Sequence, residues 1–290
     1  MSYLVQALVN GLALGSVFAL SAMGYAIVSH STRGLHVAHG GCVAVGGVVS
    51  LFAFHGLGMP AAPATLAAIA AAVVVGGLVE VLVYQPLARR AADATGGVVA
   101  SLGAFLVITG TLSAAVGARS RPPAPSAATI QIGPAVLGQT QAAQMLVAAV
   151  AAVLLLILLR VLPLGRLLRA QADDPELLSV LEGPTTAPRW IATSLGASFA
   201  GVAGALAALD VGADPGVGLS ALVTAVGAGL LAGRRLTARP MAAGLALGVL
   251  QSGVAAVVSV RWTPAAAYVL LIAVLLRHRA HPDRLSQEAA

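Results

Sequence analysis

The chain has 290 residues, of which 59% are hydrophobic and only 9% are charged, and its formal net charge is +6. Soluble globular domains carry about 25% charged residues. This composition therefore excludes an ordinary water-soluble domain and indicates a protein for which lipid is the main solvent. All 16 basic residues are Arg, and without Lys the chain has neither a Walker A phosphate loop nor a Schiff-base Lys.

Long gaps between Asp, Glu and Arg locate the membrane segments, because a spanning helix needs about 20 mostly apolar residues. They predict an all-α polytopic membrane protein with eight to nine transmembrane helices in one domain, residues 1–290. Eight crossings plus one re-entrant segment fits as well as nine crossings. The Pro- and polar-rich stretch 119–139 is expected to be a loop. The hydrophobic segments are 4–29, 37–56, 61–84, 96–117, 140–160, 188–209, 216–233, 240–260 and 263–277.

The placement of Arg orients these segments. If the 160–189 loop is cytoplasmic, strict alternation puts 13 of the 16 Arg inside and leaves Arg119, Arg121 and Arg261 outside. Such an excess is the positive-inside pattern of membrane proteins. It predicts an external N-terminus and a cytoplasmic C-terminus, and a re-entrant segment would reverse only the N-terminal end.

The first segment carries small residues at spacings of three and four, which place them on one helix face and favour close packing of another helix. Asn10 is polar within this apolar run, so we expect it to pair with a neighbouring helix or to face a cavity. Either helix packing or a transport pathway fits the run. Its small residues are Gly11, Gly15, Ala19, Ala22 and Ala26, and Ser16 and Tyr25 lie among them.

The sequence GLHVAHGG, from Gly34 to Gly41, follows the first segment. His36 and His39 are three residues apart and share one side of a helical turn. They fit pathway lining, a proton relay or interfacial His residues bonded to the backbone, whereas the lack of a nearby carboxylate or Cys argues against a metal site. Glycines such as Gly40 permit a broken or closely packed helix, as transporter sites often require.

A bounded helix is predicted between two apolar segments, within LGRLLRAQADDPELLSVLEG from Leu164 to Gly183. Asp174 suits the N-cap and Pro175 the first helical position, while Gly183 suits the end. Leu177, Leu178 and Leu181 would share one face. Such a helix either docks in the groove of a partner or lies on lipid.

Few acidic residues lie near the apolar segments. Glu80, at the end of the third segment, is expected to form an interfacial ion pair with the nearby Arg89 or Arg90. Asp210 and Asp214 flank a turn on the outer side, where they receive a partner protein or are simply solvated. No Ser/His/Asp or paired-carboxylate arrangement stands out, which argues against an intramembrane enzyme.

The pattern NG-x-x-x-GS-x-x-AL-x-A-x-GY runs from Asn10 to Tyr25. It closely matches a motif of the LivH-type inner-membrane permeases of branched-chain amino acid ABC importers, and the chain resembles this family. Its N-F-A-H-G stands here as His36-Val37-Ala38-His39-Gly40, so the family keeps the His at His39 but not at His36. Three further stretches resemble family motifs, namely Val79-Glu80 with Tyr84 to Leu87, Gly165 to Gly183, and Ser198 to Gly204. The chain departs from the family at Gly227 to Arg235, which replaces a Gly-rich motif.

The resemblance implies a multi-pass permease of the bacterial inner membrane for branched-chain or other amino acids, with related permeases carrying urea or short amides. It implies a second permease subunit, two ATPase subunits inside that use the ATP, and a periplasmic or extracellular binding protein. The chain itself would bind no cofactor or metal. The cytoplasmic loop, about 163–186, would then be the coupling element. The coupling residues would be Arg166, Arg169, Asp173, Asp174, Leu177, Leu178 and Leu181.

The rival hypothesis is a stand-alone secondary transporter or channel. It would need an ion site inside the membrane, and the cores of the apolar segments hold no Asp, Glu or Arg, which counts against proton coupling. Neutral oxygens could still bind Na⁺. Nucleic acid is excluded as a partner because the Arg residues form no aromatic-laced patch, and the single Cys42 excludes a disulfide framework.

Overall fold

The fold is taken from a computed structural model of residues 1–290. It describes residues 2–32, 34–90, 94–117, 121–124, 128–174, 177–178, 180, 186–213, 216–233, 237–258 and single positions between 262 and 276. Helices dominate, as the apolar runs require, because a backbone in lipid must satisfy its own hydrogen bonds. The helices are α1 (Ser2–Thr32), α2 (Ala38–Leu51), α3 (Ala61–Val79), α4 (Gln85–Arg89), α5 (Ala94–Val116), α6 (Gln139–Arg160), α7 (Pro163–Asp173), α9 (Thr186–Val211), α10 (Val217–Ala232) and α11 (Arg239–Val257).

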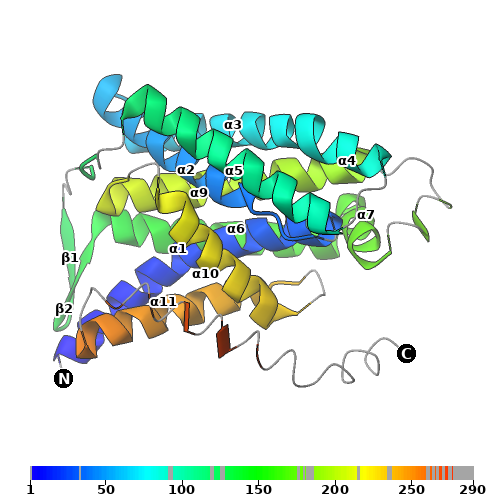
Figure 1. The fold of residues 1–290 in the computed structure, drawn as a ribbon. Coiled ribbons are helices and arrows are strands. Elements are labelled where there is room, and N and C mark those ends of the chain that lie inside the picture. Colours follow the sequence, from blue (N-terminus) through cyan, green and yellow to red (C-terminus); the bar gives the residue numbers. More distant parts are fainter. Residues whose placement is uncertain are drawn as a thin grey trace.

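The helices form one bundle with two distinct ends (Figure 1). The N-terminus and the hairpin of β1 (Thr129–Ile132) and β2 (Ala135–Gly138) lie at the first end, which we call the hairpin end. The short helix α7 lies at the other, which we call the α7 end. α9 packs against α1, α2 and α3, so it forms the centre of the bundle.

Seven helical stretches of the described chain are long and apolar enough to cross a membrane. They match seven of the nine expected segments, which confirms the all-α membrane class. α10, with 16 residues, is shorter, and most of 263–277 lies outside the described residues. The third segment and α4 form one long stretch, Ala61–Arg89, through the π-helical turn η2 (Glu80–Tyr84).

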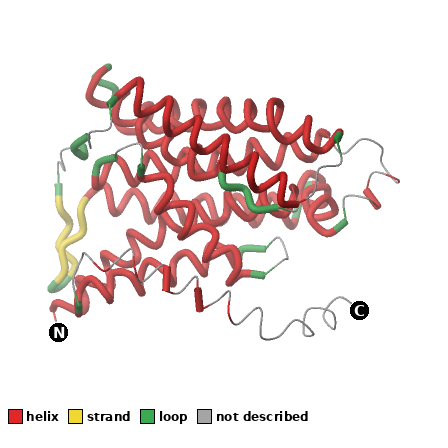
Figure 2. The backbone as a smooth tube through the Cα atoms, in the orientation of Figure 1, coloured by secondary structure: helices red, strands yellow, loops and turns green. Residues whose placement is uncertain are grey.

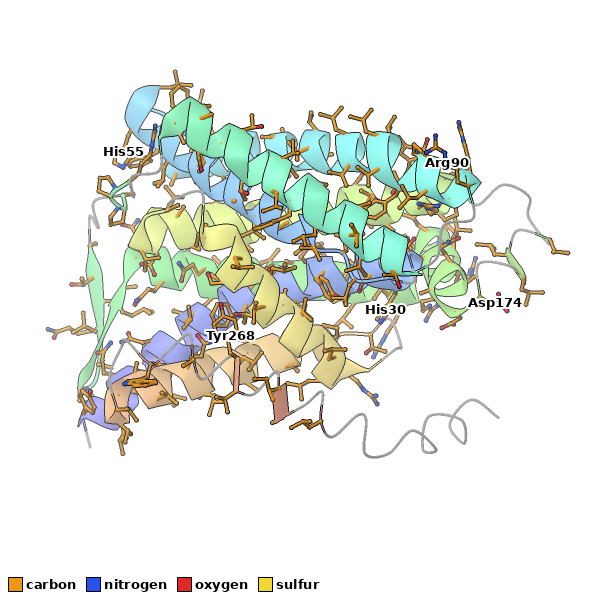
Figure 3. The ribbon with its side chains drawn as sticks, in the orientation of Figure 1. His30, His55, Arg90, Asp174 and Tyr268 are labelled. Carbon is orange, nitrogen blue, oxygen red and sulfur yellow. The ribbon has the colours of Figure 1, made fainter. Side chains whose placement is uncertain are left out.

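Charged residues gather at the α7 end. Figure 3 places His30, Arg90 and Asp174 there, and His55 at the hairpin end. The ends of α4 and α6 and the starts of α9 and α11 carry Arg at this end, as does α7. Arg121 lies apart from them, with its backbone paired to Ala213 after α9. The described Arg of the α7 end are Arg89, Arg90, Arg160, Arg166, Arg169, Arg189 and Arg239.

α2 and α10 begin inside the bundle instead of at one of its ends. Residues 34–37 form a non-helical stretch that returns beside α1 (Figure 2), so that His39 contacts the backbone of Ser21, in the middle of α1. α10 starts level with α2, because Gly40 and Gly218 touch backbone to backbone. A Cβ on either glycine would overlap the other's carbonyl oxygen. The two helices then run in opposite directions, α2 toward the hairpin end and α10 toward the α7 end.

The expected loop 119–139 contains a hairpin. β1 and β2 pair antiparallel, with Thr129 opposite Gly138. Gln6 of α1 holds the hairpin, since its side-chain amide donates to the Val136 carbonyl at 2.9 Å and accepts from the Val136 amide at 2.8 Å. The alternation within TIQI and AVLG is too short to stand out beside runs of 20 apolar residues, which is why the sequence did not reveal it.

Candidate functional site

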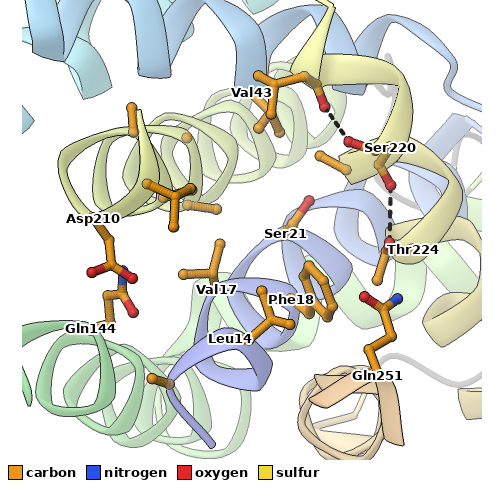
Figure 4. A pocket seen from close by; sticks show the side chains of 18 of the residues that line it. Leu14, Val17, Phe18, Ser21, Val43, Gln144, Asp210, Ser220, Thr224 and Gln251 are labelled. Carbon is orange, nitrogen blue, oxygen red and sulfur yellow. Dashed lines mark hydrogen bonds between the residues drawn. The ribbon is translucent and has the colours of Figure 1, made fainter. Parts of the chain in front are cut away.

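A cavity of about 560 Å³ opens in the hairpin half of the bundle. It lies between the first half of α1, the start of α6, the end of α9, the start of α10 and the end of α11 (Figure 4). Pockets of this size hold small molecules. Most of its wall is apolar, with Val17, Phe18 and Ala203 among the lining side chains.

The polar side chains of the cavity come from α1, α6, α9, α10 and α11 and, beyond α11, from Tyr268. Gln144 is 2% exposed and donates to the Leu206 carbonyl at 3.1 Å. Asp210, near the end of α9, accepts a hydrogen bond from the Thr140 hydroxyl at 3.1 Å. It is partly buried in the cavity wall, so the expectation that it is simply solvated is wrong. Asp214 lies outside the described residues. The remaining polar lining residues are Asn10, Ser21, Gln141, Ser220, Thr224, Gln251, Ser252 and Tyr268.

Ser21 lies at the deep end of the cavity. Its side chain is 2% exposed and its hydroxyl has no hydrogen-bond partner in the described structure. Its carbonyl accepts a hydrogen bond from His39 Nε2 at 3.0 Å. A carbonyl can only accept, so His39 carries its proton on Nε2. This bond ties the start of α2 to the middle of α1.

A second set of buried polar groups, outside the cavity wall, bond to one another. His36 Nδ1 bonds to the Tyr84 hydroxyl, which donates to Ser101 Oγ at 2.8 Å. The Ala38 amide also donates to Ser101 Oγ, at 3.0 Å. Both hydroxyls can donate and accept, so the bonds can run from His36 to Ser101 or in the reverse direction, according to the tautomer of His36. The chain of bonds satisfies the first amide of α2, which has no partner within its own helix.

Glu80 makes its ion pair with a different residue from the one expected. It is 1% exposed, and its carboxylate lies 3.1 Å from the guanidinium of Arg189 on α9. Thr193 Oγ1 donates to its second oxygen at 3.3 Å. The predicted partners, Arg89 and Arg90, are separated from Glu80 by two or more helical turns. The pair therefore joins α3 to α9 across the bundle.

The residues singled out on α1 divide between packing and the cavity. Asn10 lines the cavity and accepts from Gln6 Nε2 at 2.9 Å. A Cβ on Gly15 would lie 2.7 Å from the Leu245 carbonyl, so this glycine lets α11 approach. Ser16 bonds to the Leu12 carbonyl of its own helix at 2.8 Å. The Tyr25 ring contacts His39 edge-on, with centroids 6.0 Å apart.

The expected coupling residues lie at the α7 end, on two pieces of chain. Arg166, Arg169 and Asp173 belong to α7, a helix that the sequence reading left out. It is amphipathic and buries Gly165, Leu168 and Gln171.

Asp174 then ends α7 and caps the next turn, because its Oδ1 accepts from the Leu177 amide at 3.1 Å. Leu177 is 55% exposed and Val180 81%, but Leu178 is buried at 7%. The prediction that Leu177 and Leu178 share an exposed face is wrong, since Leu178 packs within this chain. Leu181 lies outside the described residues, so its orientation stays a prediction.

The described residues hold no cluster of three or more His, Cys, Asp or Glu that could bind a metal ion. His36 and His39 have their rings 6.2 Å apart, and each already bonds elsewhere. Cys42 is buried and has no disulfide. The arrangement therefore offers a cavity with scattered oxygen and amide groups in a largely apolar wall, which suits a small molecule.

Comparison with known proteins identifies the family of the chain. The family model described as the permease component of branched-chain amino acid transport systems matches residues 7–276. The chain belongs to this family. The permease is 29% identical over 291 residues to the high-affinity branched-chain amino acid transport system permease protein LivH of Salmonella typhimurium strain LT2, covering 94% of this chain and 93% of that protein. LivH of Salmonella typhi matches to the same extent. No solved structure matches.

The family membership confirms the resemblance stated from the sequence, and the permease is a multi-pass membrane protein of a transport system. The sequence analysis did not predict a functional role for four cavity residues, Ser21, Gln144, Thr224 and Gln251. Gln144 and Gln251 each interrupt an apolar run, and a polar residue inside a spanning segment is a signal of function. Ser21 and Thr224 carry no such signal, because a hydroxyl can bond to its own helix.

Proposed function

We propose that the chain is the permease subunit of an ATP-binding-cassette importer for branched-chain or related amino acids in a bacterial cell membrane. The observation that carries the proposal is the family match over residues 7–276. ATP hydrolysis comes from separate ATPase subunits, since this chain contains no Lys for a Walker A loop. A second permease subunit and an external binding protein complete the importer.

The Arg residues support an orientation in which the α7 end faces the cytoplasm. Seven described Arg gather there, as the positive-inside rule requires of a cytoplasmic face. The hairpin end then faces outward, where a binding protein delivers its cargo, and the cavity opens in the outer half.

The ATPase subunits dock at α7 and the turn after it. Arg166 is exposed on α7, and Leu177 and Val180 present apolar surface beside it. An apolar side chain on a short capped turn can fill a groove on a partner protein. The proposed contact residues on this surface are therefore Leu177 and Val180, with Arg166, Arg169, Asp173 and Asp174 around them.

Reconstitution tests the proposal. The chain is placed in proteoliposomes with ATPase subunits, a second permease and a binding protein from the same genome, and leucine uptake is measured. We expect uptake that requires ATP and stops when the Walker A lysine of the ATPase is replaced. Concentrative uptake by this chain alone, driven by an ion gradient without ATP, would instead establish the secondary transporter. Competition by valine, urea and acetamide separates amino acid cargo from short amides.

A matched pair of variants tests the docking surface. Leu177→Asp should weaken co-purification with the ATPase about 30-fold, since hot-spot truncations cost about 2 kcal/mol or more. Leu57, after α2 near the hairpin end, is 59% exposed, so Leu57→Asp makes the same change on the opposite face and should leave co-purification intact. Equal retention of the ATPase by both variants would indicate that the Leu177 turn lies on lipid.

A further inference from the structure

Asp210 is the one carboxylate that lines the cavity among the described residues. It sits at the last turn of α9, level with Asn10 of α1, because α1 and α9 run antiparallel and Val17 meets Ala203. Ser21 is at the deep end, 11 residues beyond Asn10 on the same helix. Figure 4 shows Asp210 next to Gln144 on one side of the space and Ser220, Thr224 and Gln251 on the other.

The carboxylate of Asp210 is only partly occupied by the protein. Thr140 donates to Oδ1, whereas Oδ2 has no hydrogen-bond partner and the residue joins no ion pair within the described chain. Among the residues that the structure describes, no Arg lines the cavity. A carboxylate without a counter-charge in this described wall, which is otherwise neutral and largely apolar, makes the cavity attractive to cations and repels anions.

A second group of the cavity also lacks a partner. The hydroxyl of Ser21 is 2% exposed and unbonded within the described structure, although a buried hydroxyl without a partner is costly. A water or a cargo in the cavity would supply the missing partner. Between Asp210 and Ser21 the wall is formed by Ala13, Val17 and Ala207, which suits an aliphatic group.

We propose that Asp210 is the ammonium-binding residue of this cavity. A cargo with a primary ammonium group and an aliphatic body places its ammonium at Oδ2 and its body against the apolar wall. The assignment deepens the proposed function and rests on it for the nature of the cargo. An inorganic cation is disfavoured because the apolar wall cannot replace its hydration shell.

Thiol chemistry in the cavity tests the charge directly. Cys42 is buried, so Cys42→Ala gives a background without a native thiol, and Ala207→Cys places a thiol one turn from Asp210 on the same face of α9. The full-length chain in nanodiscs is labelled with a cationic trimethylammonium-ethyl, an anionic sulfonatoethyl or a neutral methyl methanethiosulfonate. Each rate is divided by the rate with free 2-mercaptoethanol.

We expect the cation-to-anion ratio to fall about threefold or more in Asp210→Asn, since a unit charge a few ångströms away shifts each rate in the opposite direction. Asp210→Glu and Thr140→Val keep the carboxylate and should keep the ratio. The neutral reagent reports whether Asp210→Asn retains the cavity. Should that variant misfold, the ratio in the parent chain should still fall as salt is raised. A ratio that changes with neither Asp210→Asn nor salt overturns the proposal.

Protection against the neutral reagent identifies the preferred cargo. 3-Methylbutylamine has the ammonium group and the aliphatic body, whereas 4-methylpentanoate has the body and a carboxylate. We expect 3-methylbutylamine to slow the labelling, whereas 4-methylpentanoate and Na⁺ should leave the labelling rate unchanged. In Asp210→Asn the protection by the amine should vanish. Equal protection by the carboxylate, or by Na⁺ alone, overturns the proposal. None of these measurements needs ATPase subunits, so a failure of uptake and a failure of the Asp210 assignment are separate results.

Discussion

The two halves of the bundle surround their buried polar groups differently. In the α7 half Glu80 pairs with Arg189 and His36 bonds to Tyr84, although the Ser31 hydroxyl there has no partner in the described structure. In the hairpin half the polar groups face a cavity, and the Ser21 hydroxyl has no partner within the described structure. The comparison separates polar groups that join helices from polar groups that line a cavity. The halves should therefore respond differently to substitution.

Removing Arg189 should have the largest effect. Arg189→Ala leaves the carboxylate of Glu80, which is 1% exposed, without its counter-charge, and breaking such a pair costs about 3–5 kcal/mol. We expect the free energy of unfolding in detergent to fall by that order. The double variant Glu80→Gln with Arg189→Gln removes both charges and should recover most of the loss. Equal stability of Arg189→Ala and the parent chain would show that the pair is dispensable.

The junction between the halves should be the next most sensitive. Gly40→Ala drives a methyl group into the backbone of Gly218, where no flexible side chain can yield, and overpacking costs about 1–3 kcal/mol. Gly103→Ala is the matched control, because a Cβ there meets nothing within 4 Å. Thermal unfolding of both variants measures the difference. A midpoint for Gly40→Ala that equals that of Gly103→Ala contradicts the close contact.

The same substitution, Ser to Ala, at Ser101 and at Ser21 tests the difference between the two halves. Ser101→Ala leaves the Ala38 amide without its partner and removes one of the two hydrogen bonds of the Tyr84 hydroxyl, and it should cost about 1–3 kcal/mol of stability. Ser21→Ala removes a hydroxyl without a partner in the described structure, so the unfolding free energy should stay the same or rise. Uptake should suffer in Ser21→Ala. Parallel losses of stability in the two variants would mean that Ser21 is structural as well.

The smallest effect is expected where the hairpin meets α1. Gln6→Ala removes two hydrogen bonds to Val136, but both are exposed to solvent, so we expect at most about 1 kcal/mol. Proteolysis within 121–139 should become faster while the global midpoint hardly moves. A large drop in the midpoint would show that the hairpin stabilises the whole bundle.

The sequence was sufficient for features set by composition along the chain. Runs free of charge predicted helices such as α6 and α9, because lipid admits little else. The Arg positions predicted that one end of the bundle is charged, because successive segments run in opposite directions and every second loop therefore lies at the same end.

Features set by contacts across the bundle were not predictable. Glu80 was assigned to Arg89 or Arg90 by nearness in sequence, whereas its partner is Arg189 on another helix. Asp210 was expected to receive a partner protein or to be solvated, because nothing near it in the chain reveals that it lines a cavity between several helices.

The arrangement around His36 and His39 could be predicted only in part. The glycines around them predicted a broken or closely packed helix, and α2 does begin inside the bundle beside Ser21. Their ranking remains a prediction, since both side chains are buried and each makes one hydrogen bond. His39→Gln should keep more uptake than His39→Ala, because an amide can still donate to the Ser21 carbonyl.

The contact between Gly40 and Gly218 also has a consequence for biogenesis. α2 leaves the ribosome early and α10 only after most of the chain has been made. Until then the face of α2 at Gly40 lacks the helix that packs against it so closely. We expect the early helices to stay near the insertion machinery until α10 arrives. A ribosome stalled before α9 should leave α2 accessible to crosslinking with the translocon, and one stalled after α10 should not.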